Sequence, residues 1–219
     1  MSRFRLLSTK LLEPAQKYRL IHTGVSYTEW DFISCLPKAF SADTNNKSLI
    51  FTSQNAVKAV INQQHISVKN CYCVGEKTKS LLEKNGQKVT KMMQNSADLA
   101  TFLVKLDQKQ SFLFFTGNER MPHLEESFQR LGLPLEVVEV YTTKPQSKAL
   151  GDFDGILFFS PSGVKSYLQK NALKNSLCFA IGSTTAKALE EHTETIITAS
   201  QPSIEHLIAA VKNHFTRLV

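Results

Sequence analysis

The sequence has little of what marks chains that do not form a globule. Only 9 of its 219 residues are glycine and 7 are proline, whereas 42% are hydrophobic and 21% are charged. This balance excludes collagen-like, low-complexity and intrinsically disordered classes, because the apolar side chains bury enough surface to offset chain entropy. No run approaches the ~18 consecutive apolar residues of a membrane helix. The composition therefore indicates a globular protein of one or two domains.

Cysteine is scarce, and so is any sign of export. The four cysteines are Cys35, Cys71, Cys73 and Cys178, and the opening segment lacks the apolar stretch of a signal peptide. We therefore expect a cytoplasmic protein with reduced thiols. Cys71 and Cys73 lie two apart in an apolar run with no second ligand pair, so the sequence favours core packing and no metal.

Several catalytic motifs are also missing. The sequence contains no GxGxxG, GxxxxGK[ST], HExxH or GxSxG motif, and its six histidines are dispersed. No motif in the sequence therefore indicates a nucleotide-binding, zinc-hydrolase or α/β-hydrolase function. Because no carboxylate pair is placed as an acid and base, we expect a chemistry that depends on holding the substrate.

Positive charge is in excess. The 26 Lys and Arg outnumber the 19 Asp and Glu, which sets the formal net charge at +7 and the isoelectric point near 9.2. This excess suggests an anionic partner. The basic residues are scattered and form no block with interleaved aromatics, however, so a solvated surface is the simpler interpretation, and nucleic acid is not expected.

The chain contains an internal repeat. Shifting the sequence by 107 residues brings several separate segments into register without gaps. In this register Phe51, Ser53, Val57 and Lys58 match Phe158, Ser160, Val164 and Lys165, and Cys71, Gly75, Thr78, Leu82 and Glu83 match Cys178, Gly182, Thr185, Leu189 and Glu190. Two units of about 107 residues account for almost the whole chain.

Each repeat alternates strand and helix patterns. Short apolar runs typical of buried parallel strands occur at residues 49–51, 71–74, 112–115, 155–159 and 177–181. Segments with helical periodicity follow these runs. The alternation predicts the α/β class, with two doubly wound parallel-sheet lobes that carry helices on both faces.

One segment of each repeat departs from this rhythm. Residues 25–34 and 135–143 lie about 108 apart, alternate with a strand period and are more polar than the other strands. Paired antiparallel about a pseudo-twofold axis, they would form a two-stranded ladder that joins the lobes. We expect lobe 1 to comprise residues 1–24 and 145–219, lobe 2 residues 38–134, and the linker residues 25–37 and 135–144.

Polar loops follow the predicted strands, at the edge where ligands bind in open parallel sheets. They are Ser8-Thr9-Lys10, Thr52-Ser53-Gln54-Asn55, Gly75-Glu76-Lys77-Thr78, Thr116-Gly117-Asn118, Ser160-Pro161-Ser162-Gly163 and Gly182-Ser183-Thr184-Thr185. Each offers hydroxyl or amide groups and unpaired backbone N–H groups at a helix start. One such loop is more simply an ordinary N-cap, but six in one cleft would favour a large polyanionic ligand.

These segments resemble the successive motifs of the uroporphyrinogen-III synthase family. The motifs are LIFTSQNAV at 49–57, YCVGEKT at 72–78, FFTGN at 114–118, VVEVYTT at 137–143, FFSPSGV at 158–164 and AIGSTTAKAL at 180–189. The resemblance spans residue 4 to about 212. The chain departs from the family near its start, where Thr9-Lys10-Leu11 replaces the usual Thr-Arg-Pro.

The resemblance implies both a fold and an activity. The family has two α/β lobes joined by a two-stranded ladder, and its members are cyclising hydro-lyases. They close the linear tetrapyrrole hydroxymethylbilane into uroporphyrinogen III with loss of water and inversion of the terminal pyrrole. They use no metal or organic cofactor, and they are typically monomers. The eight carboxylates of that substrate would account for the basic charge and the anion-suited loops.

The resemblance also implies site residues. Tyr141 is the side chain expected to touch the chemistry, as a phenol that donates to the departing hydroxyl, although a tyrosine merely packed in the ladder is an alternative. The expected substrate-binding residues are Thr9, Lys10, Ser53, Thr78, Thr116, Asn118, Ser160, Ser162, Gly163, Thr184 and Thr185.

Two other functions remain open at this point. A non-catalytic two-lobe protein that closes on a polyanionic metabolite would share the hinged α/β architecture. A nucleotide-sugar transferase would also use α/β lobes, with a metal-binding Asp-x-Asp motif at its site. In every case the expected partner is a small molecule, with neither nucleic acid nor membrane involved.

Overall fold

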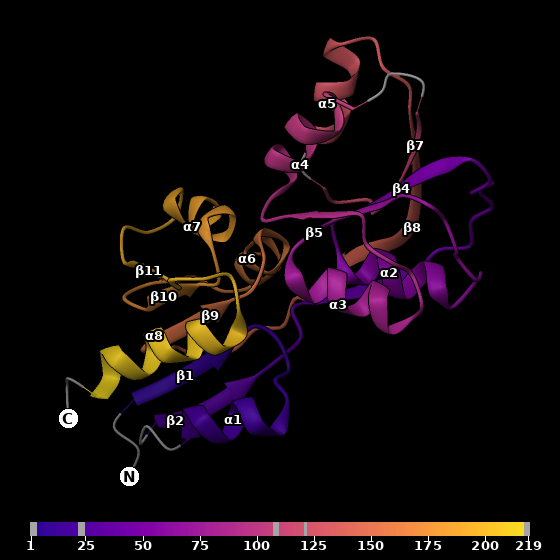
Figure 1. Ribbon diagram of the computed structural model, residues 1–219. Coiled ribbons are helices and arrows are strands. Elements are labelled where there is room, and N and C mark those ends of the chain that lie inside the picture. The colour runs from indigo at the N-terminus through magenta and orange to yellow at the C-terminus, as the bar shows by residue number, and fades with distance from the viewer. Residues whose placement is uncertain (1–3, 22–24, 107–109, 121, 217–219) are drawn as a thin grey trace. The chain divides into compact units, whose positions relative to one another are not determined.

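The structure is a computed structural model that describes residues 4–21, 25–106, 110–120 and 122–216. The chain divides into two compact units. Unit 1 is Met1–Ser34 with Lys144–Val219, and unit 2 is Cys35–Thr143. Figure 1 shows unit 1 built from the indigo start and the orange-to-yellow end of the chain.

Unit 1 contains a parallel sheet of order β11-β10-β9-β1-β2, five-stranded within the described residues. Its strands are β1 (Phe4–Ser8), β2 (Val25–Glu29), β9 (Gly155–Phe158), β10 (Leu177–Ala180) and β11 (Ile196–Thr198). Its helices are α1 (Pro14–Ile21), α6 (Pro161–Leu168), α7 (Ser183–Glu190) and α8 (Ile204–Thr216). The N-terminal strand β1 therefore lies beside β9, which comes from the far end of the chain.

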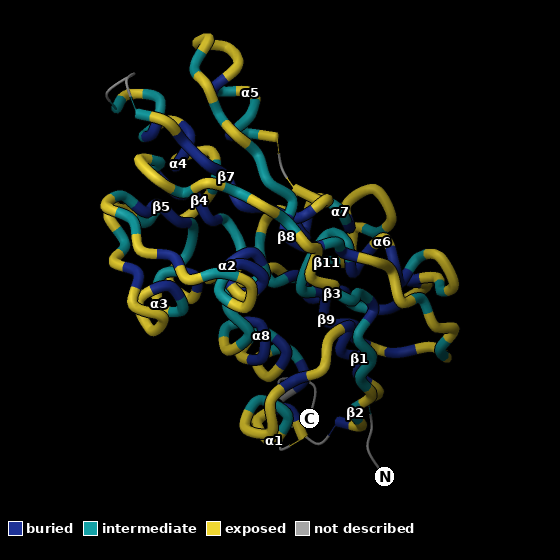
Figure 2. The backbone as a smooth tube through the Cα atoms, turned by 90° about the vertical axis from the view of Figure 1, so that its right-hand side faces the viewer, coloured by how far each residue is buried: buried dark blue, intermediate teal, exposed yellow. Residues whose placement is uncertain are grey.

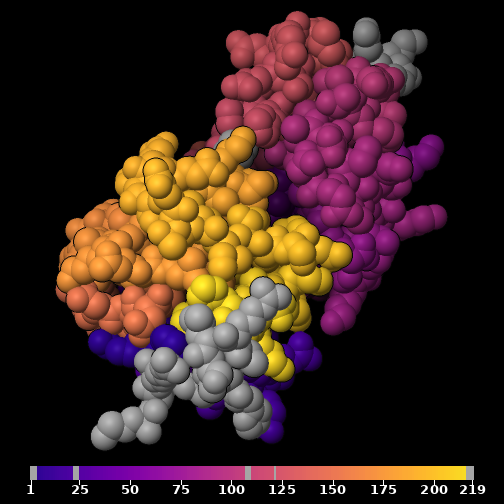
Figure 3. Space-filling model, turned by 90° about the vertical axis from the view of Figure 1, so that its left-hand side faces the viewer, coloured from indigo at the N-terminus to yellow at the C-terminus, as the bar shows by residue number. Residues whose placement is uncertain are grey.

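Helices cover both faces of this sheet, because successive strand residues point to opposite faces. Leu7 and Ile156 pack under α6 and α7, whereas Leu6 and Leu157 pack under α1 and α8. The N-terminal and C-terminal helices meet on the second face, where Gln16 Nε2 donates to Glu205 Oε1 at 3.0 Å. Figure 3 shows the indigo and yellow segments in contact there.

Unit 2 repeats this architecture with the strand order β3-β8-β7-β4-β5-β6. Its strands are β3 (Ile33–Pro37), β4 (Lys47–Phe51), β5 (Cys71–Val74), β6 (Lys91–Met93), β7 (Ser111–Gly117) and β8 (Leu135–Pro145), with β3 beginning and β8 ending in unit 1. Its helices are α2 (Gln54–Ile61), α3 (Glu76–Lys84), α4 (Ser96–Leu103) and α5 (His123–Arg130). Helices α2 and α3 cover one face, and α4 and α5 the other. In Figure 2 the strands β4, β5 and β9 trace buried segments of the tube.

The chain passes from unit 1 to unit 2 within β3 and returns within β8. These two strands are antiparallel neighbours: Gln146 N donates to Phe32 O at 2.7 Å, and Lys38 N donates to Val140 O at 2.9 Å. Cys35 faces Thr143 between these bonds, 108 residues away in sequence. This offset is close to that of the repeat, so equivalent segments of the two repeats pair with each other. The predicted fold class, α/β with duplicated parallel sheets and an antiparallel ladder, is confirmed.

The expected ladder strand at residues 25–34 differs from the structure. Residues Val25–Glu29 form β2, which pairs parallel with β1 at the edge of the unit 1 sheet, and only the next strand, β3, pairs with β8. The reason is the length of the partner strand. Strand β1 ends at Ser8, which is paired with Glu29, so β2 ends where its partner ends. The next strand, β3, takes β8 as its partner, so one predicted strand becomes two.

A glycine in β9 tests how tightly unit 1 is packed. A Cβ at Gly155 would lie 2.5 Å from Leu6 Cδ2 and 3.2 Å from the rings of Phe179 and Phe215. We expect Gly155→Ala to lower the free energy of unfolding by about 1–3 kcal/mol through overpacking. Urea unfolding followed by the fluorescence of Trp30, the single tryptophan, measures this free energy in unit 1, which contains both Trp30 and Gly155. Gly151→Ala is the control, since its Cβ would meet nothing closer than 3.5 Å, and equal losses in both variants would contradict the packing argument.

Candidate active site

Three of the predicted residues in unit 2 converge at the carboxyl ends of its strands. Tyr141 in β8 is buried, with 8% of its surface exposed, and its hydroxyl donates to Ser53 Oγ at 3.3 Å. Ser53 follows β4, and Asn118 follows β7. Because β4, β7 and β8 lie side by side in the sheet, their ends bring these residues together.

Ser53 has two roles at this edge. It is the N-cap of α2, and its Oγ accepts from Asn55 N at 3.0 Å. The same oxygen accepts from the Tyr141 hydroxyl, so both lone pairs are used and its own O–H is directed elsewhere as a donor. The N-cap interpretation and the ligand-binding one are therefore compatible at this residue.

Gly117 sets the position of the Tyr141 ring. A Cβ at Gly117 would lie 2.4 Å from Tyr141 Cζ and 2.9 Å from its hydroxyl oxygen. The β7–β8 register also shifts here, since Thr116 pairs with Glu139 but Gly117 pairs with Tyr141, which leaves Val140 as an extra residue. Such a bulge redirects side chains beside functional sites. Sequence reasoning placed Gly117 in an anion-suited loop but missed this role.

Burial determines the state of the Tyr141 hydroxyl. It raises the pKa of Tyr141 above its ordinary value of 10.0; the hydrogen bond with Ser53 lowers that pKa, and Cys35 and Glu119 raise it. The net effect is upward, so the hydroxyl is protonated at neutral pH and can act as a proton donor.

Cys35 and Asn55 complete the surroundings of Tyr141 and were not predicted. Asn55 Nδ2 donates to Cys35 Sγ at 3.1 Å, and Cys35 Sγ lies 3.9 Å from Thr143 Oγ1. Asn55 stood in one of the polar loops that follow the predicted strands, but it was not among the expected binding residues. Cys35 carried no signal, because its partner Thr143 becomes a neighbour only through strand pairing.

An ion network holds the loop after β7. Arg120 pairs with Glu125 at the start of α5 and with Glu139 of β8, where Nη1 and Oε1 are 3.2 Å apart. Lys38 pairs with the other oxygen of Glu139 at 3.3 Å. The hydrogen bond from Lys38 lowers the pKa of Glu139 most; desolvation opposes it, and the hydrogen bond from Arg120 lowers that pKa further. These cations are thus engaged with carboxylates of the protein itself.

Unit 1 brings together Thr9, Ser160 and Gly163. Ser160 caps α6, and its Oγ accepts from Gly163 N at 3.1 Å. Thr9 Oγ1 donates to Leu157 O at 2.8 Å. A Cβ at Gly163 would lie 3.7 Å from Thr9 Oγ1. Ser160 is half-buried, whereas Thr9 is buried and engaged with the backbone. The adjacent strands β1 and β9 produce this meeting.

Lys10 is exposed in the loop from β1 to α1, which carboxylates of unit 1 hold in place. Asp31 Oδ1 accepts from Leu11 N at 2.8 Å, and Glu29 Oε2 accepts from Leu12 N at 3.1 Å. Glu29 also pairs with Lys17. These carboxylates lie at the end of β2 and just after it, so the segment that was expected in the ladder instead supports the Lys10 loop.

The Glu29 contacts predict a pH-dependent stability. Burial opposes ionisation, but hydrogen bonds from Lys17, Tyr27 and the Leu12 backbone outweigh it and lower the pKa of Glu29 below its ordinary 4.5. A lowered pKa contributes stability above pH ~4.5 that is lost as the pH falls through the folded-state value. We expect the difference in unfolding free energy between the wild type and Glu29→Gln to be present at pH 7 and to shrink below pH ~4.5. Urea titrations across that range measure it, and a difference independent of pH would contradict it.

The remaining predicted residues lie at helix starts or strand ends. Thr78 and Thr185 occupy matching positions in α3 and α7, and both are buried, as is Thr116. Thr184 is exposed and Ser162 is half-buried. Among the predicted Ser and Thr residues, those that are not buried are therefore Ser53, Ser160, Ser162 and Thr184.

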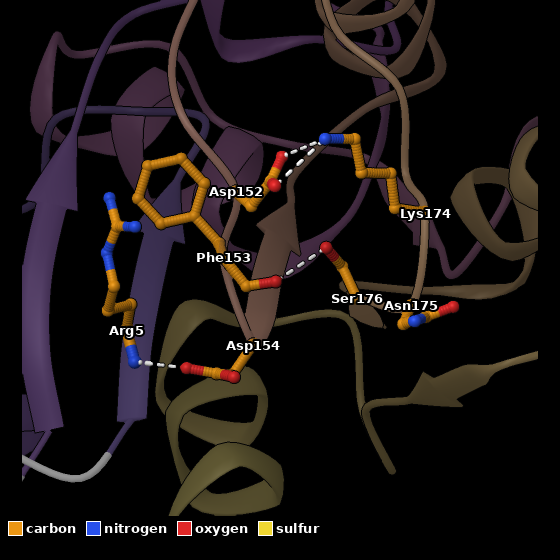
Figure 4. A pocket seen from close by; sticks show the side chains of 7 residues that line it. All are labelled: Arg5, Asp152, Phe153, Asp154, Lys174, Asn175 and Ser176. Atoms are coloured by element: carbon orange, nitrogen blue, oxygen red, sulfur yellow. Dashed lines mark hydrogen bonds and ion pairs between the residues drawn. The ribbon is translucent and has the colours of Figure 1, made fainter.

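A cavity of about 280 Å³ lies at the opposite edge of the unit 1 sheet. It adjoins the amino ends of β1, β9 and β10, and several of its polar groups pair with one another (Figure 4). Asp152 pairs with Lys174 at 2.7 Å, and Asp154 Oδ2 accepts from Arg5 N at 2.7 Å. Asp152 and Asp154 have Asp-x-Asp spacing, but the structure places them in this cavity, away from the strand-end loops.

The buried thiols are structural. Burial raises the pKa of Cys73 and of Cys178 to about 12, so both remain protonated inside the sheets. Among the residues that the structure describes, no group of three or more His, Cys, Asp or Glu side chains could hold a metal ion. None of the helices in that part of the chain has the length and apolar character needed to span a bilayer.

Comparison with known proteins assigns the fold and family. Residues 33–209 match the family model of uroporphyrinogen-III synthase HemD, whereas no curated protein matches the chain. Uroporphyrinogen-III synthetase of Helicobacter pylori 26695 superposes with a TM-score of 0.72 at 20% identity, covering 96% of this chain and 99% of that one. A mutant uroporphyrinogen III synthase of Thermus thermophilus superposes with a TM-score of 0.67 at 14% identity, covering 98% of each chain. With the matched motifs at the strand ends around Ser53, Tyr141 and Ser160, the chain belongs to the uroporphyrinogen-III synthase family and is a cyclising lyase.

Proposed function

We propose that the strand-end loops of this synthase hold the carboxylates of hydroxymethylbilane while Tyr141 assists departure of the substrate's hydroxyl. The observation that carries the proposal is the protonated, buried Tyr141 hydroxyl placed 3.3 Å from Ser53 at the carboxyl ends of the strands. The product is uroporphyrinogen III, formed with loss of water and inversion of the terminal pyrrole.

Carboxylate binding falls to the accessible donors. Lys10 and Thr184 are exposed, and Ser53, Ser160 and Ser162 are half-buried at the starts of helices. Backbone N–H groups and the helix dipoles at these starts favour negative charge. The buried Thr9, Thr78, Thr116 and Thr185 then shape the loops, Gly163 leaves room beside Thr9, and Asn118 engages the backbone of Thr143.

The chemical step requires a proton for the departing hydroxyl and a fixed arrangement of the pyrrole rings. Transfer of a proton from the Tyr141 phenol to the hydroxymethyl oxygen lets water leave and forms the azafulvene electrophile. The substituted α-carbon of the terminal pyrrole then attacks this carbon, and the bond from that α-carbon to its old methylene bridge breaks. The bridge rejoins the ring at its free α-carbon, which inverts the ring, and the proton lost from that carbon returns to the Tyr141 phenolate. Because spontaneous closure gives the non-inverted isomer, the main contribution of the protein is to hold the chain of rings in the geometry that inverts.

An isomer assay tests the function. Freshly made hydroxymethylbilane is incubated with the purified protein, and the products are oxidised and resolved by chromatography. We expect the ratio of isomer III to isomer I to rise with the enzyme concentration. Isomer I alone, formed at the spontaneous rate, would instead support a non-catalytic protein that binds a polyanionic metabolite.

The cytoplasmic location and monomeric state that the sequence indicates stay predictions. Both are consistent with a biosynthetic enzyme of this family acting on a small molecule. Size-exclusion chromatography with light scattering checks the oligomeric state against the chain mass of 24.6 kDa.

A further inference from the structure

The side chain of Asn118 copies the hydrogen-bonding pattern of a β-strand. Strand β7 ends at Gly117, whereas β8 continues beyond Tyr141, its last partner in β7. Asn118 Oδ1 accepts from Thr143 N at 2.7 Å, and Asn118 Nδ2 donates to Thr143 O at 3.4 Å. Since a carboxamide presents one acceptor and a donor much as a peptide group does, it replaces the next residue of β7.

Thr143 needs this partner because of the direction its backbone faces. The carbonyl of Val140 points to β3, where it accepts from Lys38 N. Backbone groups alternate along a strand, so those of Tyr141 and Thr143 point to the β7 side. Thr143 is buried, and no β7 residue pairs with it. Buried N–H and C=O groups are almost always paired, and here the Asn118 side chain supplies both partners.

We propose that Asn118 is a positioning residue, which pins β8 two residues beyond Tyr141 and so holds the Tyr141 hydroxyl at Ser53. Gly117 lies against the ring of Tyr141, and Asn118 secures the backbone that follows it. The loop itself is anchored, because Arg120 Nη1 donates to Gly117 O at 3.1 Å. The inference rests on the proposed function, in which the Tyr141 hydroxyl assists water loss.

This role differs from the substrate contact expected of Asn118. Both functional atoms of its side chain are engaged with Thr143, although the residue as a whole is exposed. Its second N–H is not used by these bonds, so the two roles are separated by their effects rather than by occupancy. A positioning residue acts instead through Tyr141, so its removal should have no effect in a protein that already lacks the Tyr141 hydroxyl.

The test combines a spectroscopic and a kinetic readout in the full chain. Protein labelled with ¹³C at the tyrosine Cζ is prepared as wild type, Asn118→Ala and Asn118→Asp, and the Tyr141 signal is assigned by its loss in Tyr141→Phe. Asn118→Asp keeps the acceptor for Thr143 N and loses the donor. The control is Asn85→Ala, which removes a comparable bond to Leu81 O in the same unit. Circular dichroism checks that each variant is folded, because Trp30 lies in unit 1 and the substitutions lie in unit 2.

In Asn118→Ala we expect the Tyr141 signal at pH 7 to move toward that of an exposed tyrosine. At pH 10 we expect a larger fraction of Tyr141 to be ionised than in the wild type. Both changes should be intermediate in Asn118→Asp and absent in Asn85→Ala. We expect kcat to fall about 10- to 100-fold with KM nearly constant, as for a misplaced catalytic group. In the Tyr141→Phe background, Asn118→Ala should lower kcat no further.

An unchanged Tyr141 signal in Asn118→Ala would overturn the inference, whatever the activity. If Asn118→Ala does not fold, Asn118→Asp decides by the same signal, because its stronger remaining contact keeps the strand in place. A moved signal together with full activity of Tyr141→Phe would uphold the positioning role and refute the proposed role of Tyr141. The two failures are therefore distinguishable.

Discussion

Replacing Tyr141 by phenylalanine should slow formation of uroporphyrinogen III by about 10- to 100-fold, at or below the contribution of general-acid catalysis elsewhere. Phenylalanine keeps the ring against Gly117 but removes the proton donor that lies 3.3 Å from Ser53. The loss should appear in kcat, since the loops that bind the carboxylates are unchanged. Initial rates from freshly prepared hydroxymethylbilane, with isomers resolved at each time point, give the measurement.

Tyr167→Phe is the matched control. Tyr167 is also buried, and its hydroxyl donates to Ala172 O at 3.3 Å in unit 1, away from the strand-end loops. We expect its activity to equal that of the wild type. Unchanged turnover of purified Tyr141→Phe would remove the catalytic role and leave Tyr141 as a packed residue of the ladder strand.

Gly117→Ala should lower kcat by about 100-fold, because the added methyl group occupies the position of the Tyr141 ring. The ideal Cβ lies 2.4 Å from Tyr141 Cζ and 2.5 Å from Cε2, so the ring must move by roughly the 1 Å that costs misplaced catalytic groups such factors. Overpacking should also destabilise unit 2, by about 1–3 kcal/mol. Steady-state kinetics and thermal unfolding measure the two effects separately.

A second background isolates the contact between the two residues. In Tyr141→Ala the ring is absent, so adding Gly117→Ala should cost much less stability than it does in the wild type. An equal cost in both backgrounds would show that the strain arises elsewhere. Gly151→Ala, whose Cβ meets only open surroundings and the Arg5 side chain, controls for the general effect of replacing a glycine.

Local patterns in the sequence predict most of the fold. Apolar runs such as residues 49–51 become buried strands, and a polar residue such as Ser53 or Ser160 caps the helix that follows. These features depend on neighbours within one turn or one strand, where periodicity carries the information. The repeat adds long-range information, since equivalent segments adopt equivalent structures in both units.

The prediction of the ladder was half right for a physical reason. An alternating polar segment indicates a strand but does not identify its partner, and residues 25–34 therefore suggested one strand. Strand β2 pairs with β1 only as far as Glu29, opposite the last residue of β1, and the next strand, β3, pairs with β8. In β8 the equivalent run stays continuous with a single bulge.

The candidate site divides in the same way. Motif resemblance predicts Tyr141, Ser53 and Ser160 as site residues, because these stand at strand ends and helix starts that the sequence marks, and their roles stay predictions. It did not reveal that Asn118 Oδ1 and Nδ2 both hydrogen-bond to the backbone of Thr143, or that Thr78 and Thr185 are buried. Such facts depend on the direction of a side chain after packing, and spacing along the chain does not encode that direction.

The scarcity of glycine and proline, the excess of positive charge and the duplicated motifs by themselves determined a globular α/β protein with anion-suited loops. Tertiary structure alone decided which hydroxyls reach the surface, that Arg120 and Lys38 pair with carboxylates of the chain, and that Gly117 leaves room for the Tyr141 ring. The physical reason is that composition and periodicity act within a segment. The availability of a donor, in contrast, depends on whether strands distant in sequence have already engaged it.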